Sequence, residues 1–401
     1  MKLGIIREGK IPPDKRVVLT PEQCQYIASK YPDIELKVQK SEIRKFKDEE
    51  YSALGITVVN TVEDCDVLLG VKEVPINELI PNKKYFFFSH TFKEQPYNRN
   101  LLNAILEKNI QLIDWEVVTN EKGKRLIAFG RYAGIVGCYN GFIGYGRKHG
   151  LYNLKRANEC EDRAEMEAQL PNIQLPNDFK LVLTGKGRVA GGAIEVLDKM
   201  GMKKVSPDDF LEKTFDEPVF TQLGVEYYNK TNDGRPFNKK NFFNDPTQFQ
   251  SDFLRFAQVA NMYIACHYWD SRAPFIFSRE DLRDEHWKIS IVADVSCDID
   301  CAVASTIRPS TIADPFYGYN KHSEAEDDFM KEDAVGVMAV DNLPCELPKD
   351  ASVDFGQMFI DHVLEPLTGN DPEQIIWRAS ETKDGQLTPH FAYLENYVAG
   401  L

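Results

Sequence analysis

The sequence predicts an α/β fold built on parallel sheets, and three observations carry the prediction. Short apolar runs alternate with helical stretches through residues 1–135, which is how a chain builds a parallel sheet covered on both faces. A further apolar run at 181–183 breaks into closely spaced glycines, and apolar residues then recur at helical spacing. More apolar runs follow at 261–269, 288–296 and 335–341, so a second sheet is expected.

The first part of the chain is expected to contribute six strands and two helices. One helix is predicted at Pro21–Lys30, because Thr20 is a good N-cap residue and Pro21 suits the first helical position. The other is predicted at Asn98–Asn109 from its periodicity. The expected strands are 3–6, 35–38, 56–59, 66–71, 85–89 and 110–115.

The length of 401 residues exceeds what one hydrophobic core usually supports, so two domains are expected. We assign residues 1–135 plus about 350–401 to the first domain and residues 136–349 to the second. Residues 206–255, rich in Asp, Asn, Lys and Phe, are predicted to form an insertion that decorates the second domain. The final thirty residues are expected to be irregular.

Composition excludes several classes of protein. Hydrophobic residues make up 43% and charged residues 27%, and no apolar run approaches about 18 residues, so no membrane span is expected. The net charge of -14 argues against a general nucleic-acid binder. The N-terminus lacks a signal-peptide pattern, and a cytoplasmic protein is expected. Eight scattered cysteines favour reduced, packed thiols over a metal site or disulfides.

The segment from Lys180 to Met200 predicts a dinucleotide site. Gly185 and Gly187 allow a tight turn with close backbone approach, and the following helix offers free N–H groups and a positive dipole end to a pyrophosphate. The third glycine of the usual G-x-G-x-x-G fingerprint is replaced by Ala190, with Gly191 next to it. The alternative interpretation is a glycine-rich structural turn.

Two polar residues that directly follow apolar runs predict acid/base chemistry. Lys72 follows DVLLGV and His90 follows YFFFS, and ligands of such sheets bind beyond the carboxyl ends of the strands. A partly buried amine and an imidazole together form an acid/base pair, whereas each alone is more simply a solvated strand end. Glu73 and Glu116 are expected either to tune this pair electrostatically or to be structural.

Further polar residues are candidates for binding. Arg16 lies in the loop after the first strand, where an arginine can hold a substrate carboxylate with two hydrogen bonds; a surface charge beside Asp14 is the alternative. Lys93 and Gln95 follow His90 and could line the entrance to the same site. Four residues at strand ends in the second domain are expected to flank the nicotinamide half of a cofactor, or to be polar turn residues: Asp294, Ser296, Asp341 and Asn342.

Several long motifs, in one order, resemble the alanine dehydrogenase and transhydrogenase superfamily, and within it the branch of saccharopine dehydrogenase (L-lysine-forming) and lysine-ketoglutarate reductase. The resemblance covers nearly the whole chain. It implies two Rossmann-like doubly wound parallel-sheet domains separated by a cleft, a catalytic substrate domain first and an NAD(P)-binding domain second. The motifs are IREGKIPPDKRVVLTP, GVKEVP, SHTFKEQ, AFGRYAGIVG, GKGRVAGGA, ADVSCDID, STIADPFYGY and AVDNLPCELPKDAS.

The resemblance also implies a reaction and its residues. Saccharopine, a secondary amine, would be oxidised with water to lysine and 2-oxoglutarate, or formed in the reverse direction, with a nicotinamide cofactor. Lys72 would be the base and His90 its acid/base partner. Substrate would be held by Arg16, Gln95 and Phe129, with Ser296, Cys297 and Asp298 near it. Besides the glycine turn, the cofactor would touch Arg188, Val189, Tyr268, Val295, Val340, Asp341, Asn342 and Leu343.

The choice between NAD and NADP depends on one position. NAD-selective members carry an acidic residue at the end of the second strand of the cofactor domain, where it accepts hydrogen bonds from the ribose hydroxyls. We place that position at Ser206–Asp208, with Asp208 slightly beyond the strand end. Lys203, Lys204 or Arg188 could favour a 2'-phosphate, and the reductase branch uses NADPH. The sequence therefore slightly favours NADP as the cofactor.

Two other functions stay open. One is alanine-type reductive amination of a small 2-oxo acid, and the other is a nucleotide-sensing homologue without turnover, which would not need the pair Lys72 and His90. The expected partners are a small-molecule amino acid and a 2-oxo acid, with no nucleic acid, no membrane and no metal. The sequence leaves the oligomeric state and the direction of the reaction open.

Overall fold

The computed structural model describes all of residues 1–401. The chain folds into two compact units: Met1–Phe129 with Pro348–Leu401, and Gly130–Leu347. Each unit has its own parallel sheet, which confirms the predicted α/β fold class. The chain thus leaves the first unit after Phe129 and returns to it at Pro348.

The sheet of the first unit has six parallel strands in the order β3-β2-β1-β4-β5-β6. The chain moves to one side of β1 and then to the other, which is the arrangement of a doubly wound sheet. All six predicted strands are present, with ends that differ from the prediction by at most two residues. They are β1 Lys2–Ile5, β2 Glu35–Gln39, β3 Thr57–Val59, β4 Val67–Leu69, β5 Lys84–Phe87 and β6 Gln111–Asp114.

Helix α1 begins where the sequence predicts it. The Thr20 hydroxyl accepts from the Gln23 backbone N–H, and the Gln23 side chain accepts from the Thr20 N–H, so the two residues form a capping box. The α-helices of this unit are α1 Pro21–Lys30, α2 Asp48–Ala53, α3 Arg99–Glu107, α11 Pro348–His362, α12 Leu364–Leu367, α13 Ile375–Arg378 and α14 Glu395–Ala399.

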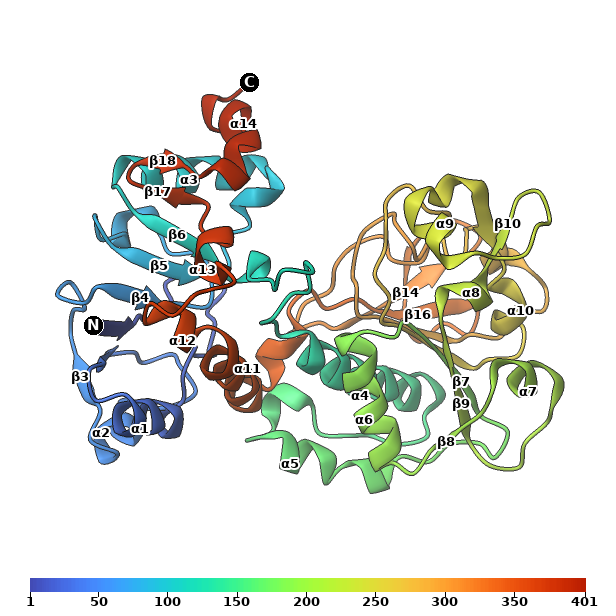
Figure 1. The fold of residues 1–401 in the computed structure, drawn as a ribbon. Helices are drawn as coiled ribbons and strands as arrows, with labels where there is room; N and C mark the ends of the chain where they lie inside the picture. The colour runs from blue at the N-terminus through green and yellow to red at the C-terminus, as the bar shows by residue number, and fades with distance from the viewer. The chain divides into compact units, whose positions relative to one another are not determined.

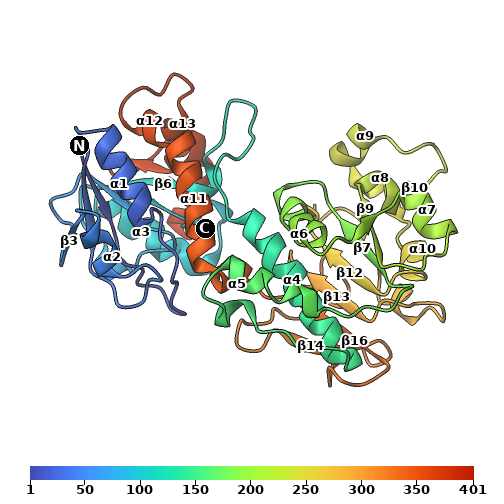
Figure 2. The same ribbon diagram turned by 90° about the horizontal axis from the view of Figure 1, so that it is seen from below.

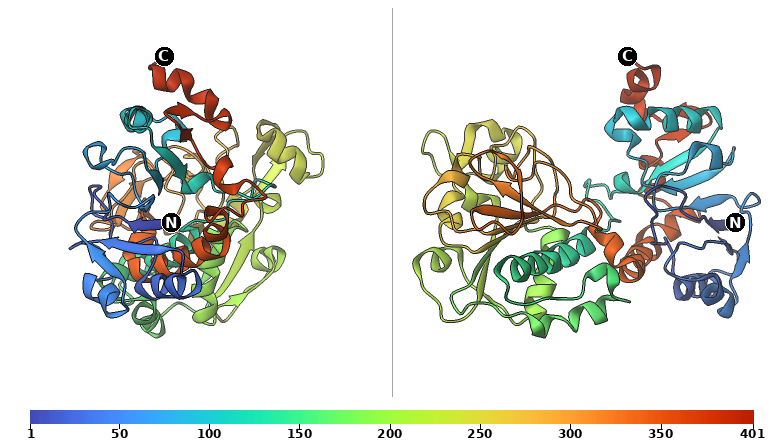
Figure 3. Two further views of the ribbon diagram at one scale, coloured as in Figure 1. Left: turned by 60° about the vertical axis from the view of Figure 1, so that its left-hand side comes forward. Right: turned by 180° about the vertical axis from the view of Figure 1, so that it is seen from behind.

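The end of the chain packs against elements from its beginning, as the red and blue-to-cyan ribbons of this unit show (Figures 1 and 3). The Glu381 N–H donates to the Leu112 carbonyl at 2.8 Å, and the Leu112 N–H donates to Thr382 Oγ1 at 3.1 Å. Phe355 of α11 meets Trp115 edge to face, with ring centroids 5.3 Å apart. The expectation of an irregular C-terminus was wrong, because α13, α14 and a hairpin of β17 (Thr382–Lys383) and β18 (Gln386–Leu387) form there.

The sheet of the second unit has eight strands in the order β15-β14-β16-β13-β12-β7-β9-β8. The strands from β16 to β8 are parallel, and β14 and β15 extend the sheet with antiparallel pairing. They are β7 Lys180–Thr184, β8 Lys203–Lys204, β9 Val219–Leu223, β12 Met262–Ala265, β13 Ile291–Asp294, β14 Phe316–Asn320, β15 Ala325–Asp327 and β16 Ala334–Met338.

Strand β9 corrects the prediction for residues 206–255. This strand lies inside the expected insertion, yet it pairs with β7 along its full length, while β8 pairs only with β9 at the edge of the sheet. Val219, Phe220 and Leu223 are fully buried. The short run VFTQL therefore belongs to the main sheet. The rest of the segment holds the hairpin of β10 (Asn229–Thr231) and β11 (Phe249–Ser251), and its Phe210, Tyr228 and Phe253 are buried in the core of this unit.

Helices α4 and α6 run side by side on one face of this sheet (Figure 2). Their backbones approach so closely that a Cβ on Gly134 would lie 1.8 Å from the Val189 carbonyl oxygen, and one on Gly192 would lie 1.9 Å from that of Arg131. The opposite face is covered by an aromatic cluster that includes Phe210. The helices are α4 Gly130–His149, α5 Arg163–Glu167, α6 Arg188–Lys199, α7 Pro207–Glu212, α8 Val225–Tyr228, α9 Lys239–Asn244 and α10 Leu254–Ala257.

Three further findings concern the class of protein. No helix combines the length and the apolar character that crossing a membrane requires. All eight cysteines are free thiols. No group of three or more His, Cys, Asp or Glu side chains has an arrangement that could hold a metal ion.

Candidate active site

Lys72 and His90 lie at the same edge of the first sheet. They follow β4 and β5, which pair in parallel with Leu69 opposite Phe86. The Phe88 N–H donates to the Val71 carbonyl at 3.0 Å, so the pairing continues up to the two residues. The parallel register therefore brings the predicted acid/base pair to neighbouring positions.

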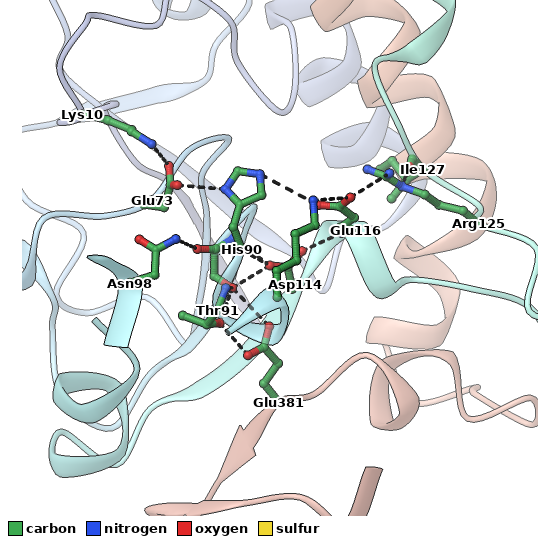
Figure 4. A network of polar contacts seen from close by, with 12 residues as sticks. Lys10, Glu73, His90, Thr91, Asn98, Asp114, Glu116, Arg125, Ile127 and Glu381 are labelled. Atoms are coloured by element: carbon green, nitrogen blue, oxygen red, sulfur yellow. Dashed lines mark hydrogen bonds and ion pairs between the residues drawn. The ribbon is translucent and has the colours of Figure 1, made fainter. Parts of the chain in front are cut away.

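The His90 ring lies between the two predicted tuning carboxylates (Figure 4). Its Nδ1 is 2.9 Å from Glu73 Oε1, and its Nε2 is 3.9 Å from Glu116 Oε2. Lys10 Nζ holds the other oxygen of Glu73 at 2.5 Å. Burial alone would raise the pKa of Glu73, but the hydrogen bonds from His90 and Lys10 lower it to about 2. Glu73 is therefore an anion that orients the imidazole through its contact with Nδ1.

Two cationic side chains lie close to Glu116. Lys93 Nζ is 2.9 Å and Arg125 Nη1 is 3.6 Å from Glu116 Oε1. The structure thus places Lys93 at this site, where the sequence expected it near His90. Lys10 had no sequence signal, because it lies in the loop after β1 among other charged residues.

The backbone at His90 adopts the left-handed conformation, with φ 56°, and a buried carboxyl group holds it. The N–H groups of Ser89 and His90 donate to Asp114 Oδ2 at 2.7 and 3.2 Å. The Ser89 hydroxyl donates to Asp114 at 2.6 Å and to Glu381 at 3.1 Å, and the Thr91 hydroxyl donates to Glu381 at 2.6 Å (Figure 4). A residue that costs energy in this conformation persists only where its surroundings impose it.

Asp114 and Glu381 form a buried carboxyl pair, both 0% exposed. Burial, together with the charge of Asp114, raises the pKa of Glu381 to about 8. Sequence reasoning missed both residues. Asp114 had a usable signal, because it ends an apolar strand run, whereas Glu381 lies in a segment without periodicity.

Glu8 supports the backbone of Lys72 in a similar way. Its two carboxylate oxygens accept from the N–H groups of Val71 and Lys72 at 2.7 and 2.8 Å, and burial raises the pKa of Glu8 to about 8. The Lys72 side chain is half-buried and makes no hydrogen bond of its own. Glu8 has no local sequence signal, since its partners are backbone groups at the end of a distant strand.

The predicted substrate residues of this unit differ in their surroundings. Arg16 is 3% exposed, and its Nη2 lies 2.6 Å from Asp14 Oδ2, so the pairing with Asp14 is present, but in the interior rather than on the surface. The Arg16 guanidinium also stacks over the Phe129 ring, 4.1 Å from its centroid. Gln95 Oε1 is buried and has no hydrogen-bond partner. These contacts leave the assignment of Arg16, Phe129 and Gln95 to substrate a prediction.

The glycine turn of the second unit opens into a cavity of about 420 Å³. Gly185 has φ 105°, and a Cβ there would lie 2.2 Å from the Cys266 carbonyl oxygen. Gly187 is the N-cap of α6, and a Cβ there would meet nothing within 4 Å. Residues 185–189, 224–225 and 266–268 line the cavity together with Tyr228, Lys239 and Phe243, and Tyr268 is largely exposed.

His267 adds a polar atom to this cavity. It is 8% exposed, its Nδ1 is 2.9 Å from the Thr184 hydroxyl, and its buried Nε2 has no hydrogen-bond partner. Burial lowers the pKa of His267 to about 4, so the ring is neutral at pH 7. A glycine turn with space above it, the start of α6 and an unpaired polar atom fit the pyrophosphate and ribose of a dinucleotide.

The other predicted cofactor and substrate residues of this unit lie after β13 and β16 and do not line that cavity. The Ser296 hydroxyl donates to buried Asp294 at 2.6 Å. Burial and nearby carboxylates raise the pKa of Cys297 to about 12. The remaining predicted contacts have these surroundings: Val295 and Leu343 pack near Gly137 of α4, Val340 is buried, Asn342 is half-buried, and Asp298 and Asp341 are exposed.

The sheet order also bears on the residues that the sequence assigned to the cofactor ribose. Ser206–Asp208 follow β8, which lies at the edge of the sheet, with β9 between it and β7. The strand end beside the glycine turn is that of β9, since the Gly185 N–H donates to the Leu223 carbonyl at 3.0 Å. Glu226, three residues later, was not considered in the sequence because it falls within the expected insertion.

Comparison with known proteins relates residues of the first unit to a family model and the whole chain to a known fold. Residues 4–136 match the family model described as alanine dehydrogenase/PNT, N-terminal domain. An L-alanine dehydrogenase of known structure superposes with a TM-score of 0.68 at 15% identity, covering 100% of this chain and 99% of that one. This likeness confirms the fold.

Two relatives confirm the resemblance to the saccharopine dehydrogenase branch. An alpha-aminoadipic semialdehyde synthase of Arabidopsis thaliana is 27% identical over 438 residues, with 98% of this chain covered. The chain spans only 41% of the length of that protein. A saccharopine dehydrogenase [NAD(+), L-lysine-forming] of Candida albicans is 25% identical over 405 residues and is covered over 95% of its own length, against 94% of this chain.

Proposed function

We propose that the chain catalyses the oxidation of saccharopine to lysine and 2-oxoglutarate, or the reverse condensation, with a nicotinamide cofactor. The observation that carries the proposal is the His90 imidazole held between Glu73 and Glu116 beside Lys72, in a unit of alanine dehydrogenase/PNT type. A protein that only senses a nucleotide has no need of this pair. The relatives named for saccharopine and aminoadipic semialdehyde chemistry support the choice of substrate.

In this proposal, the first unit supplies the proton transfers. Lys72 accepts the proton of the secondary amine, because hydride can leave the neighbouring carbon only when the nitrogen is neutral. His90 then relays protons during attack of water and collapse of the carbinolamine. Glu73 fixes the orientation of the ring at Nδ1. Arg16 and Gln95 are proposed to hold substrate carboxylates, with Phe129 beside them.

The second unit is proposed to hold the cofactor at Gly185–Val189, with the pyrophosphate at the start of α6. When bound, the nicotinamide accepts or donates the hydride. Tyr268 and His267 would line the same cavity. The residues proposed to flank the nicotinamide half are Val295, Ser296, Cys297, Asp298, Val340, Asp341, Asn342 and Leu343.

One assay tests the proposal. Oxidation of NADH and of NADPH is followed by absorbance with lysine plus 2-oxoglutarate, and separately with ammonium plus pyruvate. Turnover with lysine and 2-oxoglutarate is expected. Turnover only with ammonium and pyruvate would replace the proposal by alanine-type reductive amination, and cofactor binding without turnover on either pair would favour a sensor.

A further inference from the structure

The loop of residues 89–98 carries His90 and Gln95, two of the proposed site residues. Its regular structure is limited to two short 3₁₀ turns. His90 and Glu94 both adopt the left-handed conformation, with φ of 56° and 55°. This conformation is unfavourable for residues other than glycine and persists only where contacts impose it. The shape of the 89–98 loop therefore depends on what holds it.

Three side chains from the end of the chain hold this loop at points along its length. Glu381 accepts from two hydroxyl groups at the start of the loop (Figure 4). The Tyr393 hydroxyl donates to the Phe92 carbonyl at 2.9 Å. The Tyr397 hydroxyl, on the C-terminal helix α14, donates to the Gln95 carbonyl at 2.5 Å. The loop that carries proposed site residues is thus fixed by a segment about 300 residues downstream.

The two tyrosines differ in burial. Tyr397 is 5% exposed and belongs to an apolar cluster against which Phe92 also packs, whereas Tyr393 is 53% exposed. Water can replace the hydrogen bond of an exposed hydroxyl, but it replaces that of a buried one only at a cost in free energy. The contact of Tyr397 therefore constrains the loop more strongly than that of Tyr393.

Gln95 is held through its backbone, while its side chain lacks a partner for one polar atom. The Gln95 carbonyl accepts from the Tyr397 hydroxyl and from the Asn98 N–H, the latter at 3.0 Å. The side-chain Oε1 of Gln95 is buried and has no hydrogen-bond partner. A buried polar atom without a partner costs free energy, which a hydrogen bond to a ligand would offset.

The position of the Gln95 amide depends on the backbone that carries it. A binding group that is displaced by about 1 Å loses much of its effect, so groups that contact substrate are commonly fixed by neighbours that do not. Tyr397 has this relation to Gln95, because its only polar contact with the loop is the Gln95 carbonyl.

We infer that Tyr397 is a positioning residue of the active site, which holds the backbone of Gln95 so that the Gln95 amide meets the substrate. The inference rests on the proposed function, in which Gln95 binds a carboxylate of the amino acid or of the 2-oxo acid. It gives helix α14 a role in substrate binding. The proton transfers at Lys72 and His90 do not depend on this contact.

Steady-state kinetics of Tyr397→Phe test the inference, because this substitution removes the hydroxyl and keeps the ring in the apolar cluster. The KM for lysine or for 2-oxoglutarate is expected to rise about tenfold, while kcat falls less than about threefold and the Kd of the cofactor stays within about twofold. Tyr393→Phe is the matched control. It also loses a hydroxyl that contacts the loop, and its KM values should equal those of the wild type.

A double-mutant cycle with Gln95→Ala separates positioning from a general structural role. Gln95→Ala alone should raise the same KM at least about tenfold. Adding Tyr397→Phe should raise it by less than about twofold more, because the amide that Tyr397 positions is already absent. Hydrogen exchange gives a measurement without turnover: the Asn98 amide should exchange faster in Tyr397→Phe than in the wild type and in Tyr393→Phe.

Unchanged KM values in folded Tyr397→Phe would overturn the inference and leave the proposed function intact. Additive effects in the cycle, or unchanged exchange at Asn98, would overturn it as well. A parallel loss of kcat and cofactor affinity would make Tyr397 a structural residue only. A wild type without turnover on lysine and 2-oxoglutarate would overturn the proposed function, before any variant is compared. Melting curves show whether each variant is folded.

Discussion

At the scale of single residues, buried carboxyl groups support the backbone of His90 and Lys72 at the sheet edge, in addition to the side-chain pairing of His90 with Glu73. Asp114 accepts the N–H groups of Ser89, His90 and Glu116, and Glu8 accepts those of Val71 and Lys72. Buried carboxylates in such roles are costly unless they are fully hydrogen-bonded. Clusters of buried titratable groups are typical of functional sites, which supports this sheet edge as the candidate active site.

Replacing the proposed base tests that assignment. Lys72→Met keeps the length of the side chain and removes the amine, so turnover should fall at least about 100-fold, while cofactor affinity stays within about twofold. Steady-state kinetics and cofactor titration measure the two effects. Lys122→Met, at an exposed position, is the control and should behave as wild type. A parallel loss of cofactor affinity would make Lys72 a nucleotide contact instead.

The buried carboxyl pair predicts a pH-dependent stability. The folded pKa of Glu381 is about 8, above the ordinary glutamate value of about 4.3, so the folded state keeps a proton that the unfolded chain releases. The stabilisation is complete below about pH 4.3 and is lost as the pH rises toward 8. Glu381→Gln cannot titrate, so between pH 5 and pH 8 its stability should improve relative to wild type by about 1 kcal/mol or more.

Thermal melts at several pH values measure this difference. Glu8 has a raised pKa in the same range, but it is present in both proteins and cancels in the comparison. Glu395→Gln, at an exposed position, should track the wild type throughout. An E381Q melting temperature that runs parallel to wild type across this range would show that Glu381 is ionised in the folded protein.

At the scale of elements, glycines decide how α6 is placed. The space above Gly187, at the start of α6, is open, while another face of the helix touches α4. The same contrast is seen between two neighbouring residues of the helix. Gly191 is exposed with open space around it, whereas Gly192 is buried against the Arg131 carbonyl.

This neighbouring pair makes a sharp stability test. Gly192→Ala would place a methyl group 1.9 Å from a backbone oxygen, so the two helices must separate, and a loss of about 2–4 kcal/mol is expected. Gly191→Ala gains helix propensity and should leave stability unchanged or raise it by up to about 1 kcal/mol. Denaturant unfolding measures both. Equal effects of the two substitutions would contradict the contact between α4 and α6.

At the scale of the whole chain, the first unit depends on a segment more than 200 residues downstream of Phe129. Leu102 of α3 forms a cluster with Phe391, Leu394 and Tyr397, and Ser380 bridges to Ile113 of β6. The unit is therefore closed only after the second unit has been synthesised. Contacts of such long sequence separation slow folding.

Deleting residues 371–401 tests this closure. The deletion exposes the apolar cluster and removes Glu381 from beneath the backbone of His90, so the first unit should lose its protection against proteolysis. The second unit lacks these contacts and should keep its own unfolding transition in calorimetry. Retention of full protection in residues 1–129 would show that the C-terminal segment is dispensable for that unit.

The sequence by itself determined the α/β class, the six strands of the first sheet, the glycine turn and the residues His90, Lys72, Glu73 and Glu116. These are local signals, because apolar periodicity, turn glycines and polar residues at strand ends are all legible within a few neighbours. The matched positions of Lys72 and His90 also followed from parallel register, which fixes both strand ends at one edge.

Only the tertiary structure decided which strands are neighbours and which buried charges meet. Strand order placed β9 beside β7 and so brought Glu226 to the glycine turn in place of Asp208. Chain return brought Glu381 to Asp114. Neither result has a local signal, because pairing between distant strands is chosen by burial and hydrogen-bond satisfaction over the whole domain.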